Sequence, residues 1–177
     1  MFSDEFIRDF SWNGNERNRL LVNMGNGSFV EAAAAYGLDS LRDGRGLAVS
    51  DFDADGDLDF FVSNYNSPAQ FFVNKVARGH WLRLRLRGRE SNRDAVGAIL
   101  RIRNGSHRQM RVVTAGGGYA SQSSRVIHFG LGEYATVEEI EIVWPSGRKQ
   151  VFSSVAADQV LEIDELEGQG TVVGNGK

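Results

Sequence analysis

Nine consecutive residues hold five carboxylates with the spacing that a divalent cation requires. Single residues separate the aspartates, and one of these separators is a glycine; the aspartates are Asp51, Asp53, Asp55, Asp57 and Asp59. Carboxylates this close together repel one another unless a cation neutralises them. Calcium takes six to eight oxygen ligands, whereas magnesium keeps more of its water. The pattern D-x-D-x-D-G-x-x-D therefore predicts a calcium-binding loop.

The order of residues within this loop indicates how it would hold the ion. We expect the first three aspartates to point inward as the loop curls, and Gly56 to allow the sharp turn. The backbone carbonyl of Asp57 adds a further oxygen, and Asp59 closes the loop from the start of the next strand. An EF-hand loop would need a glutamate where this chain has Val62. The alternative that stays open is a solvated acidic turn between two strands.

The elements that position this loop are predicted to be short strands. Only residues 32–36 favour a helix, about one turn long, with Gly37 as its stop. The runs predicted as strands are 19–23, 47–50, 58–63, 71–74, 81–87, 99–103, 110–114, 126–129, 137–144, 150–152 and 160–163. So many short strands predict an all-β fold. We expect a β-propeller-blade-like region around the calcium loop and a β-sandwich or barrel after it.

The strand predicted at 81–87 alternates leucine and arginine, so its two faces differ. One face is apolar, and the other carries Arg83, Arg85 and Arg87, which form a candidate face for a polyanion. The favoured alternative is that these arginines pair with the acidic segments on either side. Residues 78–125 carry a net charge of +9, and the segments before and after them carry −6 each.

The change of charge near residue 78 also marks a predicted domain boundary. We expect a repeat region at 1–77, a β domain at 78–166 and a flexible, glycine-rich tail at 167–177.

The 177 residues include no cysteine, which excludes disulfides, thiolate metal sites and cysteine nucleophiles. No apolar run approaches the roughly 20 residues of a membrane-spanning helix. The acidic first ten residues predict that this chain contains no signal peptide.

Three segments around the calcium loop resemble a known repeat. Residues 46–62 (GLAVSDFDADGDLDFFV) are similar to an FG-GAP or VCBS repeat, the blade unit of integrin-type β-propellers. Residues 23–29 (NMGNGSF) resemble the N-x-G-x-G-x-F segment before such a repeat, and residues 71–74 (FFVN) resemble the start of the next blade. The resemblance implies that the five aspartates of the loop bind calcium.

The rest of the chain resembles an ASPIC/UnbV domain, which follows FG-GAP repeats in the cartilage acidic protein-like family. The motifs that carry this resemblance are HWL at 80–82, SNRDAVGA at 91–98, GGGY at 116–119, SQS at 121–123, HFGLG at 128–132 and WPSG at 144–147. Their order and spacing are more specific than any one of them.

The resemblance implies a calcium-stabilised, non-enzymatic recognition or adhesion module, located outside the cell or in the periplasm. Its partner would be a protein or a polysaccharide rather than nucleic acid. A propeller needs about four to eight blades, so we expect the rest of a propeller or another chain at the blade edges. Two alternatives stay open: a polyanion binder, and a calcium-dependent enzyme or accessory protein of bacterial secondary metabolism. No nucleophile or acid–base pair in the sequence argues for an enzyme.

Overall fold

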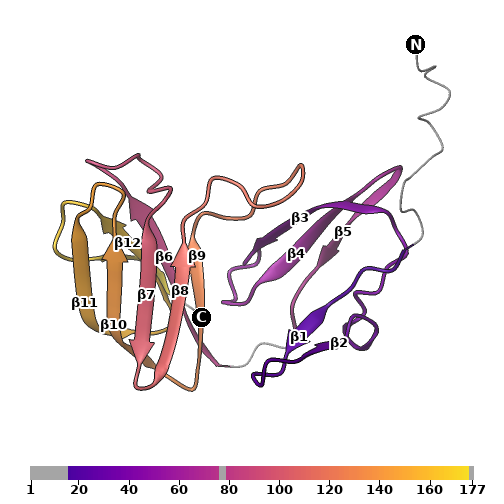
Figure 1. Ribbon diagram of the computed structural model, residues 1–177, viewed down its shortest axis with the longest axis horizontal. Coiled ribbons are helices and arrows are strands. Elements are labelled where there is room, and N and C mark those ends of the chain that lie inside the picture. Colours follow the sequence, from indigo (N-terminus) through magenta and orange to yellow (C-terminus); the bar gives the residue numbers. More distant parts are fainter. Residues whose placement is uncertain (1–15, 76–78, 176–177) are drawn as a thin grey trace, which may run out of the picture.

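The computed structural model describes residues 16–75 and 79–175, and this part of the chain is all-β. Its strands form one two-stranded, one three-stranded and two four-stranded sheets, and none of these sheets closes into a barrel (Figure 1). The predicted helical turn is a short 3₁₀ helix, η2 (Ala34–Tyr36), which ends at Gly37 with a φ of 69°. No helix in the described ranges has the length and hydropathy that crossing a membrane requires.

The first five strands make two antiparallel sheets, which we call the repeat region. The strands are β1 (Leu21–Asn23), β2 (Phe29–Glu31), β3 (Gly44–Ser50), β4 (Asp59–Asn64) and β5 (Ser67–Phe72). β1 pairs with β2, and the other three lie in the order β3-β4-β5. β5 begins earlier than predicted because Asn66, with a φ of 49°, closes a tight turn that pairs Asn64 with Ser67.

The remaining strands form two four-stranded sheets in the orders β11-β10-β7-β8 and β13-β12-β6-β9 (Figure 1). The strands are β6 (His80–Arg87), β7 (Ile99–Asn104), β8 (His107–Val112), β9 (Ile127–Gly132), β10 (Thr136–Val143), β11 (Lys149–Ala156), β12 (Gln159–Asp164) and β13 (Thr171–Asn175).

One apolar core lies between these two sheets and makes them a sandwich. On one sheet the alternate residues Leu82 and Leu84 are fully buried, and Phe129 pairs with Leu82 from the neighbouring strand. On the other sheet Ile140 and Ile142 are fully buried. All five belong to one cluster of packed side chains. The period-two alternation of the sequence therefore sets which face of each strand is inside.

The structure differs from the sequence prediction in two strands of the sandwich. β8 starts at His107 rather than at residue 110, because Asn104 and His107 pair directly across the turn at Gly105. The tail predicted to be flexible from residue 167 instead contains β13, which pairs with β12 along the edge of its sheet. Backbone hydrogen bonds to β12 hold this segment, although its side chains bury little area.

Candidate metal centre

The five aspartates lie in and next to the loop between β3 and β4, and we call residues 51–59 the aspartate loop. Asp59 is the first residue of β4, as predicted. Two residues turn the loop sharply through positive φ values, Ala54 at 63° and Gly56 at 103°. A loop that reverses in this way can direct several side chains toward one point.

Three of the predicted ligands come together. One carboxylate oxygen from each of Asp51, Asp53 and Asp59 lies within 4.8 Å of the other two. Oδ1 of Asp51 is buried and has no hydrogen-bond partner among the described residues. Asp59 is fully buried, and its two oxygens accept the backbone N–H groups of Phe52 at 3.0 Å and Asn74 at 2.8 Å. An unpartnered buried oxygen beside two further carboxylates fits a hard cation that prefers oxygen ligands.

The other two predicted ligands, Asp55 and Asp57, are not part of this three-carboxylate cluster. Oδ1 of Asp55 accepts the backbone N–H of Asp57 at 3.0 Å, which tightens the turn. Oδ2 of Asp57 is buried without a hydrogen-bond partner in the described ranges. Burial, followed by repulsion from Asp55, raises the pKa of Asp57. The loop thus holds more negative charge than its own hydrogen bonds stabilise.

The outer face of β6 supplies one positive charge to this loop. Nη1 of Arg83 lies 2.6 Å from Oδ2 of Asp51, and these side chains are only 17% and 1% exposed. The Arg83 guanidinium also covers the ring of Trp81, with 4.8 Å between its Cζ atom and the ring centroid. Arg83 is therefore paired with the aspartate loop. This distinguishes it from Arg85 and Arg87, the other two arginines of the predicted polyanion face.

Aromatic rings of the sandwich hold the turn of the aspartate loop. Nε2 of His128 lies 2.8 Å from the carbonyl oxygen of Gly56, to which it can donate its N–H. The His128 ring stacks with Trp81 at 6.4 Å between centroids and 16° between planes. Burial lowers the pKa of His128, Arg83 lowers it further, and the bond to Gly56 opposes them. His128 is therefore a neutral hydrogen-bond donor at neutral pH.

A long loop of the sandwich makes a second contact with the repeat region (Figure 1). This segment, residues 113–126, follows the edge of β3. The hydroxyl of Ser123 accepts the N–H of Val49 at 3.2 Å, and the N–H of Ser124 donates to the carbonyl of Val49 at 3.3 Å. The backbone of Ala120 also lies close to Gly46. We call these contacts, together with those of Trp81, Arg83 and His128, the junction.

Sequence reasoning found the aspartates but not the residues that hold their loop in the junction. Trp81 and His128 fall within the HWL and HFGLG motifs, and Arg83 falls within the arginine strand. The available signal was the charge contrast, because an arginine-rich strand follows closely after an aspartate-rich loop.

Replacing Arg83 with lysine should destabilise the protein by about 1 kcal/mol. Lysine keeps the positive charge beside Asp51 but loses the flat guanidinium that covers Trp81. Chemical unfolding of the full chain measures the change. The matched control is Arg85→Lys on the same strand, where the pair with Glu162 is longer, at 3.6 Å, and more exposed. Equal losses for the two variants would show that the contact with Trp81 contributes nothing.

Comparison with known protein families gives two matches in separate parts of the chain. The model for the FG-GAP-like repeat matches residues 7–62, and the model named ASPIC and UnbV matches residues 88–170. The first match covers the aspartate loop, and the second covers most of the sandwich.

Curated relatives also match part of the chain. Cartilage acidic protein 1 of Xenopus tropicalis is 35% identical over 133 residues, which is 70% of this chain and 20% of the relative. Cartilage acidic protein 1 of Mus musculus is 41% identical over 71 residues, which is 40% of this chain and 11% of the relative. The chain thus spans a fifth or less of the length of these relatives.

Proposed function

Because the chain belongs to the proteins that carry an FG-GAP-like repeat and an ASPIC and UnbV domain, we propose that it is a calcium-binding, non-enzymatic recognition module. The observation that carries the proposal is the unpartnered buried oxygen of Asp51 beside Asp53 and Asp59. Asp51, Asp53 and Asp59 would provide carboxylate ligands, and Asp55 and Asp57 would complete the set. Bound calcium would supply the positive charge that this loop lacks.

The junction links this ion to the arrangement of the whole chain. Asp51 would coordinate the ion through one oxygen, while its other oxygen lies 2.6 Å from Arg83. Gly56 lies in the same loop and accepts a hydrogen bond from His128. An ion that fixes the curl of the loop would therefore also fix the repeat region against the sandwich. A rigid pair of domains is suited to recognition, because little conformational entropy is lost when a partner binds.

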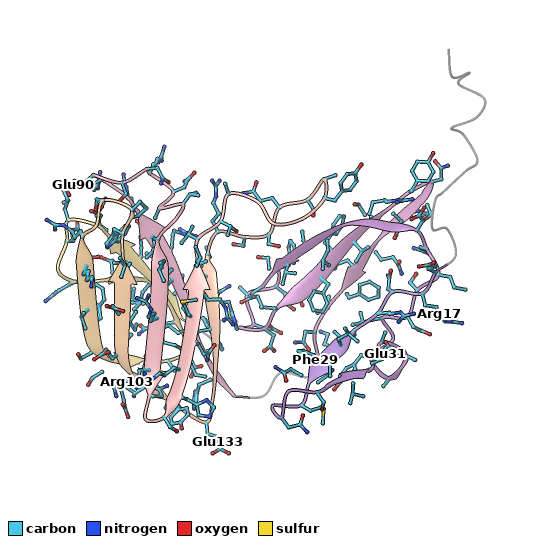
Figure 2. All side chains as sticks on the ribbon, viewed as in Figure 1. Arg17, Phe29, Glu31, Glu90, Arg103 and Glu133 are labelled. Atoms are coloured by element: carbon cyan, nitrogen blue, oxygen red, sulfur yellow. The ribbon has the colours of Figure 1, made fainter. Side chains whose placement is uncertain are left out.

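The surface of the repeat region supports a further part of the proposal, that its faces are covered in the complete assembly. Leu21 and Phe29 are each 60% exposed, and Phe71 is 49% exposed. Figure 2 shows Phe29 on the side of the region that β1 and β2 form. A hollow of about 290 Å³, lined partly by Leu47 and Phe60, opens on the same region. Contiguous exposed apolar groups mark interaction surfaces. Further repeats or another chain would cover them.

We place the module outside the cell or in the periplasm, with a protein or polysaccharide as its partner. The absence of cysteine is compatible with either compartment. The similarity to cartilage acidic protein 1 supports the first of these locations.

Calcium titration of the full chain tests the metal proposal. After treatment with a chelator, calorimetry should show binding, and calcium at about 100 times its dissociation constant should stabilise the fold by roughly 2.7 kcal/mol. Magnesium should bind more weakly. Asp53→Asn should weaken calcium binding tenfold or more, because a charged ligand is lost from the cluster.

The matched control is Asp39→Asn, which removes an exposed carboxylate that pairs with Arg17 outside the aspartate loop. This variant should bind calcium like the unchanged protein. A chain that shows no heat of binding and the same melting temperature in calcium and in chelator would overturn the proposal.

A further inference from the structure

Four arginines from three segments of the sandwich surround a hollow that the aspartate loop does not use. The hollow has a volume of about 300 Å³, at the lower end of the range for small-molecule sites. Its charged lining residues are Arg85, Arg87, Arg93, Asp94, Arg125 and Glu162. We call it the arginine hollow. Its arginines come from β6, from the loop after that strand and from the segment before β9.

The charges that line the arginine hollow do not balance. Arg125 forms an ion pair with Asp94, and Arg85 lies 3.6 Å from Glu162. Within residues 16–75 and 79–175, Arg87 and Arg93 have no carboxylate within ion-pair distance. Arg87 acts on the carboxylate of Asp164 only at longer range. The hollow therefore has an excess of two positive charges.

Several other arginines of the sandwich pair with carboxylates. Arg101 lies 2.8 Å from Glu141, and Arg103 lies 2.9 Å from Glu138, both across the β7–β10 pair of strands. The interpretation from the sequence, that the arginines pair with acidic neighbours, therefore holds for Arg101 and Arg103. It does not describe Arg87 and Arg93, so their charges are available to a ligand.

The wall of the hollow that carries Arg93 is held in place by hydrogen bonds to its backbone. The carbonyl of Arg93 accepts the N–H of Gly88 at 3.0 Å. The side chain of Asn92 bonds to both the N–H and the carbonyl of Val96 at 2.8 Å. The carboxylate of Glu165 accepts the backbone N–H groups of the first residues of the same loop. Figure 2 shows Glu90 of this loop at the end of the sandwich opposite to Arg103 and Glu133. A backbone held in this way loses little entropy when a ligand binds.

We propose that the arginine hollow binds a tetrahedral oxyanion, the sulfate or phosphate group of an ester. Guanidinium groups match the oxygens of such groups with paired, charge-assisted hydrogen bonds. Arg87 and Arg93 contact the anion, while Arg85 and Arg125 lie beside it and keep their partners Glu162 and Asp94. Arg83 takes no part, because Asp51 engages it. The site is independent of the proposed calcium site.

Calorimetry with two model ligands tests this site in the full chain. The probes are sucrose octasulfate and inositol hexakisphosphate, in a buffer with chelator and near-physiological salt. The unchanged protein should bind one or both, and the probe that binds more tightly identifies the ester. The double variant Arg87→Gln/Arg93→Gln should bind at least tenfold more weakly.

The matched control is Arg101→Gln/Arg103→Gln, which removes the same charge from the other sheet. It should change the affinity by less than threefold. Equal losses in the two double variants would reveal attraction to net charge alone, and no binding of either probe by the unchanged protein would also overturn the site. Calcium binding, measured separately, should be the same in all three proteins, so this test and the calcium test can fail independently.

Discussion

Replacing Glu165 with glutamine should lower the free energy of unfolding by about 3 kcal/mol at pH 7. This carboxylate is fully buried. Its Oε2 accepts the backbone N–H groups of Arg89, Glu90 and Ser91 at 2.6, 2.8 and 2.8 Å. Its Oε1 accepts the hydroxyls of Ser91 and Ser146 at 2.7 and 2.6 Å. A glutamine would offer one oxygen to these donors and would direct its own N–H groups toward the rest of them.

The pKa of Glu165 gives the size and the pH dependence of this effect. Burial alone would raise the pKa, but hydrogen bonds from Ser146, Ser91 and Arg89 lower it from 4.5 to about 2. A pKa that is lower in the folded state stabilises that state above the unfolded pKa, and the stability is lost as the pH falls through the folded value. The difference between the two values corresponds to roughly 3 kcal/mol.

Unfolding by urea at several pH values measures this. Wild type and Glu165→Gln should differ fully at pH 7, and the difference should shrink between about pH 4.5 and pH 2. Glu162→Gln is the matched control, because this neighbouring carboxylate is partly exposed and lies 3.6 Å from Arg85. It should cost less than about 1 kcal/mol at any pH. A difference for Glu165→Gln that stays constant down to pH 2 would contradict the assigned role of its charge.

The sequence could predict the aspartate loop because every feature of that loop is local. Five carboxylates, one glycine and two flanking apolar runs lie within a few residues of one another. The strand at 81–87 was predictable for the same reason, since alternation separates its leucines from its arginines. These local patterns are enough to predict an all-β fold, which the structure confirms.

What the arginines contact could not be predicted, because alternation gives a face but not the element that covers it. Arg83 meets the aspartate loop of the repeat region, while Arg87, further along the same face of the strand, has no such partner among the described residues. Glu165 was missed because it lies in an acidic stretch near the predicted tail, where carboxylates are usually solvated. Only the folded chain brings the donors at 89–91 and Ser146 around it.

Replacing Gly56 with alanine should destabilise the protein by about 3 kcal/mol and open the contact between the aspartate loop and the sandwich. A Cβ atom at this position would lie 2.0 Å from Nε1 of Trp81, and 2.5 Å from Cδ1 and Cε2 of the same ring. Trp81 is only 7% exposed and packs against both Arg83 and His128, so it cannot move without disturbing them. Overpacking costs roughly 1–3 kcal/mol. The φ of 103°, which disfavours any side chain, adds a further cost.

Two comparisons separate the clash from the backbone strain. Gly25→Ala is the matched control, because Gly25 has a φ of 78° but no atom lies within 4 Å of the position that its Cβ would take. Only backbone strain remains there, so the loss should be about 1 kcal/mol.

The double variant Gly56→Ala/Trp81→Ala should lose less stability than the sum of its single changes, because the ring that causes the clash is gone. In Gly56→Ala the indole N–H resonance of Trp81 should shift, since its contact with the loop is displaced. If the two changes are additive and this resonance stays in place, the loop does not pack on Trp81 in solution, and the coupling of the aspartate loop to the sandwich is lost with it.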